Sequence, residues 1–159
     1  LTKRFTALSH VVLGFAIGLA PLAAWLAIVG EVSWPPVLLR AAVMFWVAGF
    51  DGIYSLQDVE YDRESRLHSL PARFGIPAAL RISSAFHAAT VLLLGTTAWW
   101  TGSGAFAYCG IAIVAAILFW EHQIVKPHDL SRVNVAFFNL NGYVSVLLLV
   151  AFATDVLVR

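Results

Sequence analysis

Charged side chains are scarce in this sequence: only 12% of its 159 residues are charged, whereas 60% are hydrophobic. Soluble domains are typically about a quarter charged. A globular chain this short also needs a polar exterior, which so few polar side chains cannot supply. The mean hydropathy of +0.83 points the same way. This shortage of charge excludes an ordinary soluble domain and favours a lipid bilayer as the solvent of the chain.

Cysteine and excess charge of either sign are nearly absent as well. Cys109 is the only cysteine, so no disulfide can form within the chain, and its place in an apolar run predicts a small buried residue. The net charge is only +1, which gives no basic footprint for nucleic acid. We therefore expect no nucleic-acid partner.

Long apolar runs are what the sequence has instead. A helix that crosses a bilayer needs about 20 mainly apolar residues. Five segments qualify, and none alternates polar and apolar residues as the strands of a membrane barrel do: residues 8–29, 36–54, 79–100, 105–124 and 133–158. The sequence predicts an all-α, polytopic transmembrane helix bundle, with one domain over residues 1–159. Small residues in the first span, Gly14, Gly18, Ala23 and Ala24, are expected to let neighbouring backbones approach closely.

The basic residues predict how the bundle is oriented. Eight of them lie in regions that face one side of a sequential bundle: Lys3, Arg4, Arg63, Arg66, Arg73, Arg81, Lys126 and Arg132. The other side has Arg40 and Arg159, with Trp34, Trp99 and Trp100 near that interface. Because basic residues concentrate on the cytoplasmic side, the long polar connection over residues 55–77 is predicted to be cytoplasmic.

Three aspartates stand where the second span runs into that connection. At about 100° per residue in a helix, Asp58 lies about 20° from Asp51, and Asp62 lies about 40° from Asp58. An acid at membrane depth costs about 2.5 kcal/mol or more, so these carboxylates need a counter-charge. Hard oxygen ligands favour Mg²⁺, which binds one or two carboxylates together with substrate phosphates. The alternative is a solvated helix end whose acids pair with nearby arginines.

The same residues resemble a known family. The pattern Asp51-x-x-Tyr54-x-x-x-Asp58-x-x-x-Asp62 is similar to the second aspartate-rich motif of the UbiA superfamily of intramembrane prenyltransferases. Three other stretches resemble the family in the same order along the chain: residues 3–6 (its basic motif), residues 68–75 (the segment after the aspartates) and residues 139–143 (the asparagine region of its last helix). Residues 121–134 look most like the 4-hydroxybenzoate polyprenyltransferase subgroup, which includes enzymes of the futalosine route to menaquinone.

The resemblance implies a reaction and a set of site residues. The family transfers a polyprenyl group from its diphosphate to an aromatic ring in ubiquinone or menaquinone biosynthesis, with Mg²⁺ as cofactor. Asp58 and Asp62 match the metal ligands, and Asp51 joins them as a catalytic candidate. The substrate-binding candidates are Lys3, Arg4, Tyr54, Arg66, His68 and Asn141. The implied partners are polyprenyl diphosphate, a small aromatic acceptor and the lipid bilayer, and the implied location is a bacterial inner membrane with the site facing the cytoplasm.

Family members have nine transmembrane helices and two aspartate-rich motifs, whereas this chain resembles helices five to nine with the second motif. We therefore expect the chain to be the carboxy-terminal half of such an enzyme, inactive without the amino-terminal half. Each candidate also has a plainer interpretation: Lys3 and Arg4 as membrane anchors, His68 as a loop-stabilising residue, and Asn141 as a bridge between helices. His10 and His87 are expected to be hydrogen-bonded bundle residues, while Glu121, His122 and His128 are expected to meet water near an interface.

Three other functions fit parts of the pattern. A cation- or proton-coupled transporter also carries intramembrane acids, but it predicts acids spread along a pathway. A soluble isoprenyl diphosphate synthase binds diphosphate through aspartates, although the five apolar spans argue against it. A structural membrane subunit would tolerate loss of Asp58 and Asp62 together.

Overall fold

The computed structural model describes residues 2–158. Leu1 and Arg159, the latter assigned above to the outer side, lie outside that range. Five helices are long and apolar enough to cross a membrane, by length and composition. Four of them are built on α1 (Ser9–Val29), α2 (Trp34–Tyr54), α5 (Ile76–Trp100) and α6 (Ala105–Ile124). The fifth consists of the π-helical segment η3 (Val135–Leu140) and α7 (Asn141–Val158). These elements confirm the all-α bundle and the five predicted spans.

The helix ends follow local backbone chemistry. Gly30 ends α1 in the left-handed conformation, where its N–H binds the Leu26 carbonyl. Pro35 and Pro36 lie in the first turn of α2, and Pro77 in the first turn of α5, where a missing N–H costs nothing. Asp155, from α7, accepts hydrogen bonds from the backbone N–H groups of Gly104 and Ala107 at the start of α6. These features place the turns between the spans.

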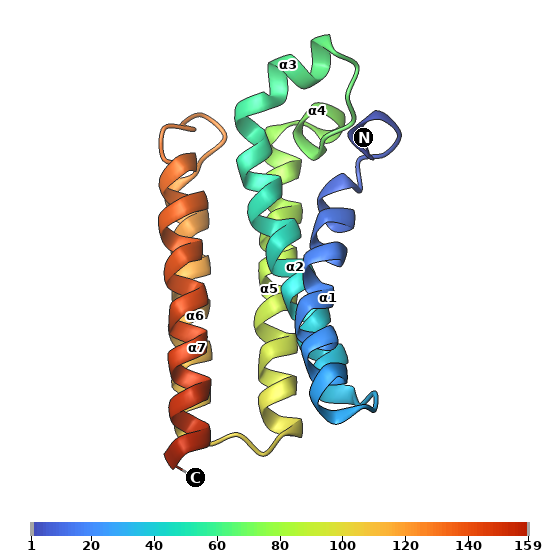
Figure 1. Cartoon of the computed structure of the whole chain (residues 1–159). Helices are drawn as coiled ribbons and strands as arrows, with labels where there is room; N and C mark the ends of the chain where they lie inside the picture. The colour runs from blue at the N-terminus through green and yellow to red at the C-terminus, as the bar shows by residue number, and fades with distance from the viewer. Residues whose placement is uncertain (1, 159) are drawn as a thin grey trace.

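Two groups of helices make up the bundle (Figure 1). Helices α1, α2 and α5 pack together, while α6 and α7 lie side by side as a pair joined to them through the short turn after α5. A Cβ on Gly14 would meet the Met44 carbonyl oxygen, and one on Gly18 would meet the Arg40 carbonyl oxygen, so the predicted close approach at these two glycines is confirmed. Ala23 and Ala24 are exposed, so the same prediction is wrong for them.

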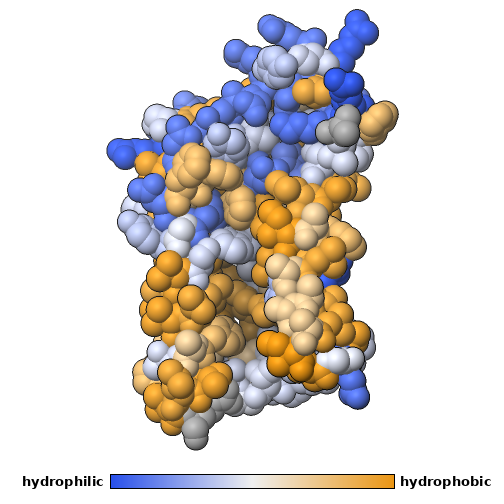
Figure 2. Space-filling model, in the orientation of Figure 1, coloured by the Kyte–Doolittle hydropathy of each residue, from blue (hydrophilic) through white to orange (hydrophobic). Residues whose placement is uncertain are grey.

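The polar connection gathers at one end of the bundle. It contains three short helical elements: η2 (Ser55–Asp58), α3 (Val59–Glu64) and α4 (Leu70–Phe74). The 3-10 segment η1 (Thr2–Arg4) lies beside them, and α7 ends at the opposite end of the bundle (Figure 1). In the space-filling view, polar residues cover the end with α3 and α4, while apolar residues cover most of the rest (Figure 2). The structure therefore has one polar end, formed by segments far apart in sequence.

Two predicted burial states are wrong. Cys109 is exposed on α6. A small apolar side chain on a membrane-spanning helix can be covered by lipid or by another helix, so it does not need to lie in the core of this bundle. Glu121, expected to meet water, is 0% exposed because it lies on the face of α6 turned toward the other helices.

Candidate active site

Lys3 contacts two of the three aspartates of the motif. Its Nζ lies 3.3 Å from Asp62 Oδ2 and 3.8 Å from Asp58 Oδ2. The Asp62 side chain is only 2% exposed, whereas that of Asp58 is 51% exposed. One ammonium thus faces two carboxylates, of which one is removed from water. The cluster has an excess of negative charge, which leaves room for a further cation.

A local change in helix type sets this arrangement. Residues Ser55–Asp58 form a 3-10 turn between α2 and α3, and the Ser55 hydroxyl donates to the Gly52 carbonyl at 2.8 Å. A 3-10 turn advances about 120° per residue, so the phase of the helix shifts between Asp51 and Asp58. Asp58 and Asp62 remain one turn apart on the same side, where Lys3 meets both.

Asp51 does not join this cluster. Its Oδ2 lies 2.6 Å from Nδ1 of His10 on α1. Within residues 2–158, no group of three or more acidic, histidine or cysteine side chains is placed to hold a metal ion. The prediction that Asp51 lies within about 20° of Asp58 around the helix, and so on one face with Asp58 and Asp62, is therefore wrong, because it assumed an unbroken α-helical phase. That His10 is hydrogen-bonded within the bundle is confirmed.

The segment that carries Lys3 is fastened to the connection after α3. The Lys3 carbonyl accepts a hydrogen bond from the His68 backbone N–H at 2.6 Å, and His68 Nδ1 lies 3.3 Å from the same oxygen. His68 therefore stabilises the loop and holds the Lys3 backbone in place. Its predicted contact with substrate remains a prediction.

Two neighbouring pockets on the polar end are lined by basic residues. One, of about 520 Å³, is lined by Thr2, Lys3, Arg4, Tyr61, Ser65, Arg66 and Leu67. The other, of about 400 Å³, is lined by Arg63, Arg66, Leu67, His68, Ala72 and Arg73. Arg66 lines both, and its φ of 53° follows the end of α3, where the Leu67 N–H binds the Asp62 carbonyl. Lys3, Arg4 and Arg66 thus meet at one place, as a diphosphate site requires.

An aromatic wall lies deeper along α2. Tyr54 stacks on Phe137 with ring centroids 4.2 Å apart, and Phe50 meets the same ring edge-on at 5.4 Å. Phe137 belongs to the π-helical segment η3, a kind of distortion that is frequent at functional sites. This wall places Tyr54 beside a surface that suits an aromatic ring or a hydrocarbon chain.

Asn141 secures the distorted segment. Its side-chain Nδ2 donates to the carbonyls of Ala136 and Phe137, both at 3.1 Å, and its Oδ1 accepts from Trp46 Nε1 at 2.7 Å. The amide therefore bridges α2 and α7 and satisfies carbonyl groups freed by η3. Its predicted place in the wall of a substrate cavity remains a prediction.

Comparison with known proteins identifies the family. The UbiA prenyltransferase family matches residues 1–143 of the chain. The chain belongs to this family. Its fold also matches the apo structure of a UbiA homolog from Aeropyrum pernix K1, with a TM-score of 0.81, 34% identity, and coverage of 98% of this chain and 58% of that one.

The curated relatives named here are both 4-hydroxybenzoate prenyltransferases. The chain is 32% identical over 155 residues to the 4-hydroxybenzoate octaprenyltransferase of Cronobacter sakazakii, covering 98% of this chain and 53% of the relative. It is 29% identical over 132 residues to the 4-hydroxybenzoate solanesyltransferase of Synechocystis, covering 78% and 41%. The chain spans about half the length of the curated relatives it matches. Family membership and the apolar helices make it an integral membrane protein, and the relatives named here do not support the transporter alternative.

The Asp58–Asp62 pair fits the divalent cation expected of this family. Carboxylate oxygens one helical turn apart are the hard ligands that Mg²⁺ prefers. The single ammonium of Lys3 balances only one of the two carboxylate charges. Because the Asp62 side chain is buried, water does little to stabilise the remaining charge. The donor set and its charge therefore suit a dication that also contacts a phosphate.

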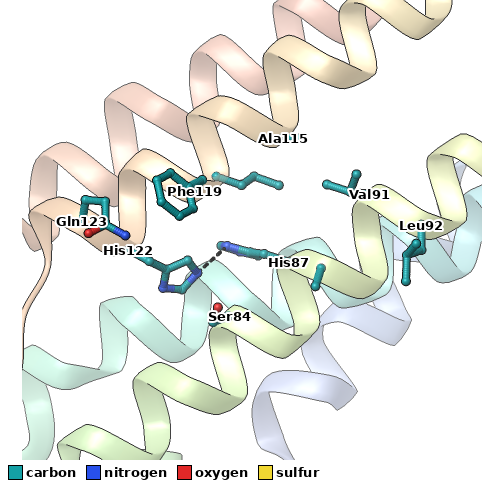
Figure 3. A pocket seen from close by; sticks show the side chains of 10 residues that line it. Ser84, His87, Val91, Leu92, Ala115, Phe119, His122 and Gln123 are labelled. Atoms are coloured by element: carbon teal, nitrogen blue, oxygen red, sulfur yellow. Dashed lines mark hydrogen bonds between the residues drawn. The ribbon is translucent and has the colours of Figure 1, made fainter.

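A second polar cluster in the family fold lies between α5 and α6 (Figure 3). His122 Nε2 lies 3.0 Å from His87 Nδ1, and Glu121 Oε2 lies 3.5 Å from the same His87 atom. The two histidines line a largely apolar pocket of about 460 Å³ together with Val91, Leu92 and Phe119. That His87 is hydrogen-bonded within the bundle is confirmed. Sequence reasoning missed the cluster, because Glu121 and His122 are 34 and 35 residues from His87 and lie on a separate span.

Proposed function

We propose that this chain forms the carboxy-terminal half of an intramembrane enzyme that transfers a polyprenyl group from polyprenyl diphosphate to an aromatic acceptor. The acceptor is 4-hydroxybenzoate or a close analogue, as in the names of the relatives, and the product enters ubiquinone or menaquinone biosynthesis. The amino-terminal half of the family fold is needed for activity. The enzyme lies in a bacterial inner membrane, and its site faces the cytoplasm.

The convergence of Asp58 and Asp62 on Lys3 is the observation that carries the proposal. Segments 55 residues or more apart in sequence meet there, at the polar end of an otherwise apolar bundle. Arg4 and Arg66 line the adjoining pocket. Carboxylates and basic side chains at one site are the combination that a metal-bound diphosphate requires, since the acids hold the cation and the cations hold free phosphate oxygens.

Asp58 and Asp62 would hold Mg²⁺. When bound, the ion supplies positive charge to the diphosphate oxygens. Lys3, Arg4 and Arg66 bind the same oxygens and stabilise the negative charge that develops as the bond between the allylic carbon and oxygen breaks. The diphosphate leaves with the bonding electrons, the ring carbon of the acceptor bonds to the allylic carbon, and the ring loses a proton.

Apolar and aromatic surfaces complete the site. Tyr54 and Phe137 present ring faces below the diphosphate end, where their π-electrons favour a developing allylic cation. An apolar pocket of about 400 Å³ at the far end of the bundle offers room for part of the hydrocarbon chain. Its lining comes from α1, α2, α5, α7 and the turn after α5: Pro21, Trp25, Pro35, Pro36, Leu39, Leu94, Thr97, Thr101, Ser103, Leu148, Phe152 and Val156.

The direct test is a transfer assay with the complete enzyme in bilayers. Labelled 4-hydroxybenzoate and a set of other aromatic acceptors are supplied with octaprenyl diphosphate, with Mg²⁺ or with a chelator. The proposal expects a prenylated product with a 4-hydroxybenzoate-type acceptor and none after chelation. Absence of product with every acceptor, from protein that is folded and inserted, would contradict it.

A further inference from the structure

His10 and Asp51 form a buried polar pair in the contact between α1 and α2. The His10 side chain is 1% exposed and that of Asp51 is 24% exposed, and Nδ1 and Oδ2 are 2.6 Å apart. A nitrogen and an oxygen approach this closely when a proton lies between them. The pair therefore links the two helices through one short, charge-assisted hydrogen bond.

The second ring nitrogen indicates where that proton resides. His10 Nε2 lies 3.4 Å from the backbone nitrogen of Leu70, whose N–H group can only donate. Nε2 accordingly accepts, and the proton of the neutral ring is on Nδ1, from which it is donated to Asp51. The histidine is thus fixed on both sides, by the first residue of α4 and by the aspartate.

Asp51 lies deeper in the second span than the Asp58–Asp62 pair. Asp51 is seven positions before Asp58, which puts it roughly 10–12 Å further toward the middle of the span. With the diphosphate at Asp58 and Asp62, the acceptor attacks the allylic carbon from the side away from the phosphates. Asp51 is then level with the acceptor, while the aromatic wall of Tyr54 and Phe137 borders the same depth on α2 and η3.

We propose that His10 is a positioning residue for the aromatic acceptor, acting through Asp51. By holding Oδ2, it orients the carboxylate so that Oδ1 meets the polar group of the acceptor. The inference rests on the proposed function, and it assigns His10 a task separate from diphosphate binding. A purely structural histidine would stabilise the α1–α2 contact without affecting the two substrates differently.

The test compares His10→Leu with His10→Asn in the complete enzyme, with kinetic constants for each substrate normalised to folded protein. Leucine cannot donate to Asp51, whereas the amide nitrogen of asparagine stands near the position of Nδ1. We expect H10L to lower kcat/KM for the acceptor by about tenfold or more, as loss of one charge-assisted hydrogen bond would. The KM for polyprenyl diphosphate is expected to change by less than about twofold, and H10N to recover most of the loss.

His87→Leu is the matched control, since it removes a buried histidine of α5 that pairs with His122 and Glu121 rather than with Asp51. It should leave the KM for the acceptor unchanged. Nitrogen-15 NMR chemical shifts of the His10 ring in the wild type add a measurement that needs no substitution at His10. We expect them to show a proton on Nδ1 and none on Nε2.

The outcomes separate the two proposals. A folded wild type with no prenyl transfer would overturn the proposed function and this inference together. If the wild type is active, two results would overturn the inference alone. In one, H10L keeps normal kinetic constants for both substrates; in the other, H10L raises the KM for the acceptor and the KM for polyprenyl diphosphate equally. A proton on Nε2 of His10 would do the same.

Discussion

Lys3 is the residue on which the charges of the site converge. It contacts the buried Asp62 and the more exposed Asp58, and the backbone of its own segment is held by His68. Its side chain is 32% exposed, so it can turn from the carboxylates toward a diphosphate in the adjoining pocket. We therefore propose that Lys3 binds phosphate rather than serving only as a membrane anchor.

Replacing Lys3 with glutamine should therefore weaken binding of polyprenyl diphosphate. We expect its KM to rise by about tenfold, the typical loss for one charge-assisted contact, with little change in the KM for the acceptor. Steady-state kinetics on the complete enzyme give both values. The control is Arg81→Gln, which removes a positive charge near the same end on exposed α5 surface. Equal effects of the two substitutions would contradict a specific role for Lys3.

The sequence predicted some of these residues and missed others for identifiable reasons. Asp58 and Asp62 could be paired in advance, because the chain after Asp58 is α-helical and residues four apart in an α-helix share a face. The position of Asp51 could not, since the 3-10 turn at Ser55–Asp58 shifts the phase. The partners Lys3 and His10 are 59 and 41 residues away from Asp62 and Asp51, and such distant pairings depend on how the helices pack.

At the scale of elements, the contact between α1 and α2 holds the site together. It positions the Lys3 segment before α1 against the aspartates at the end of α2. Gly14 and Gly18 make that contact possible, because a side chain at either position would meet the backbone of α2. Their spacing in an apolar segment predicts close packing, but not which neighbouring helix they contact.

Gly14→Ala should separate α1 from α2. Because the added Cβ would meet the Met44 carbonyl oxygen, we expect a loss of roughly 1–3 kcal/mol in the free energy of unfolding, typical of overpacking. Gly95→Ala is the matched control, since a Cβ there has open space in α5. It should be neutral or slightly stabilising. Unfolding in mixed micelles measures both, and equal stability of the two variants would disprove the tight contact.

The whole molecule has one polar and one apolar end, and this asymmetry follows the distribution of its basic residues (Figure 2). The five spans were predictable because each needs a long apolar run, which sequence displays directly. The arrangement of these spans, with α1, α2 and α5 beside the pair α6 and α7, was not predictable from sequence, since all the spans are similarly apolar. The resemblance to UbiA proteins, now established by the family match, supplied the site residues that hydropathy alone does not reveal.

Membrane orientation can be tested with single cysteines. The native cysteine is first removed by Cys109→Ser, together with any other cysteine of the complete protein. In that background, we expect Ser65→Cys to react with a membrane-impermeant reagent only from the cytoplasmic side. Glu31→Cys, in the turn after α1, should react only from the opposite side. Both native residues are exposed. The reverse labelling pattern would contradict the orientation predicted from the basic residues.

The most direct test of the account concerns metal-dependent binding of polyprenyl diphosphate by the aspartate pair. Asp58→Ala and Asp62→Ala are compared with Glu60→Ala, which removes an exposed acid from the same short helix. We predict that the two aspartate variants fold but bind diphosphate in Mg²⁺ about a hundredfold or more weakly, because each loses a direct metal ligand. Glu60→Ala should bind as the wild type does. Near-normal Mg²⁺-dependent binding by both aspartate variants would contradict the central claim.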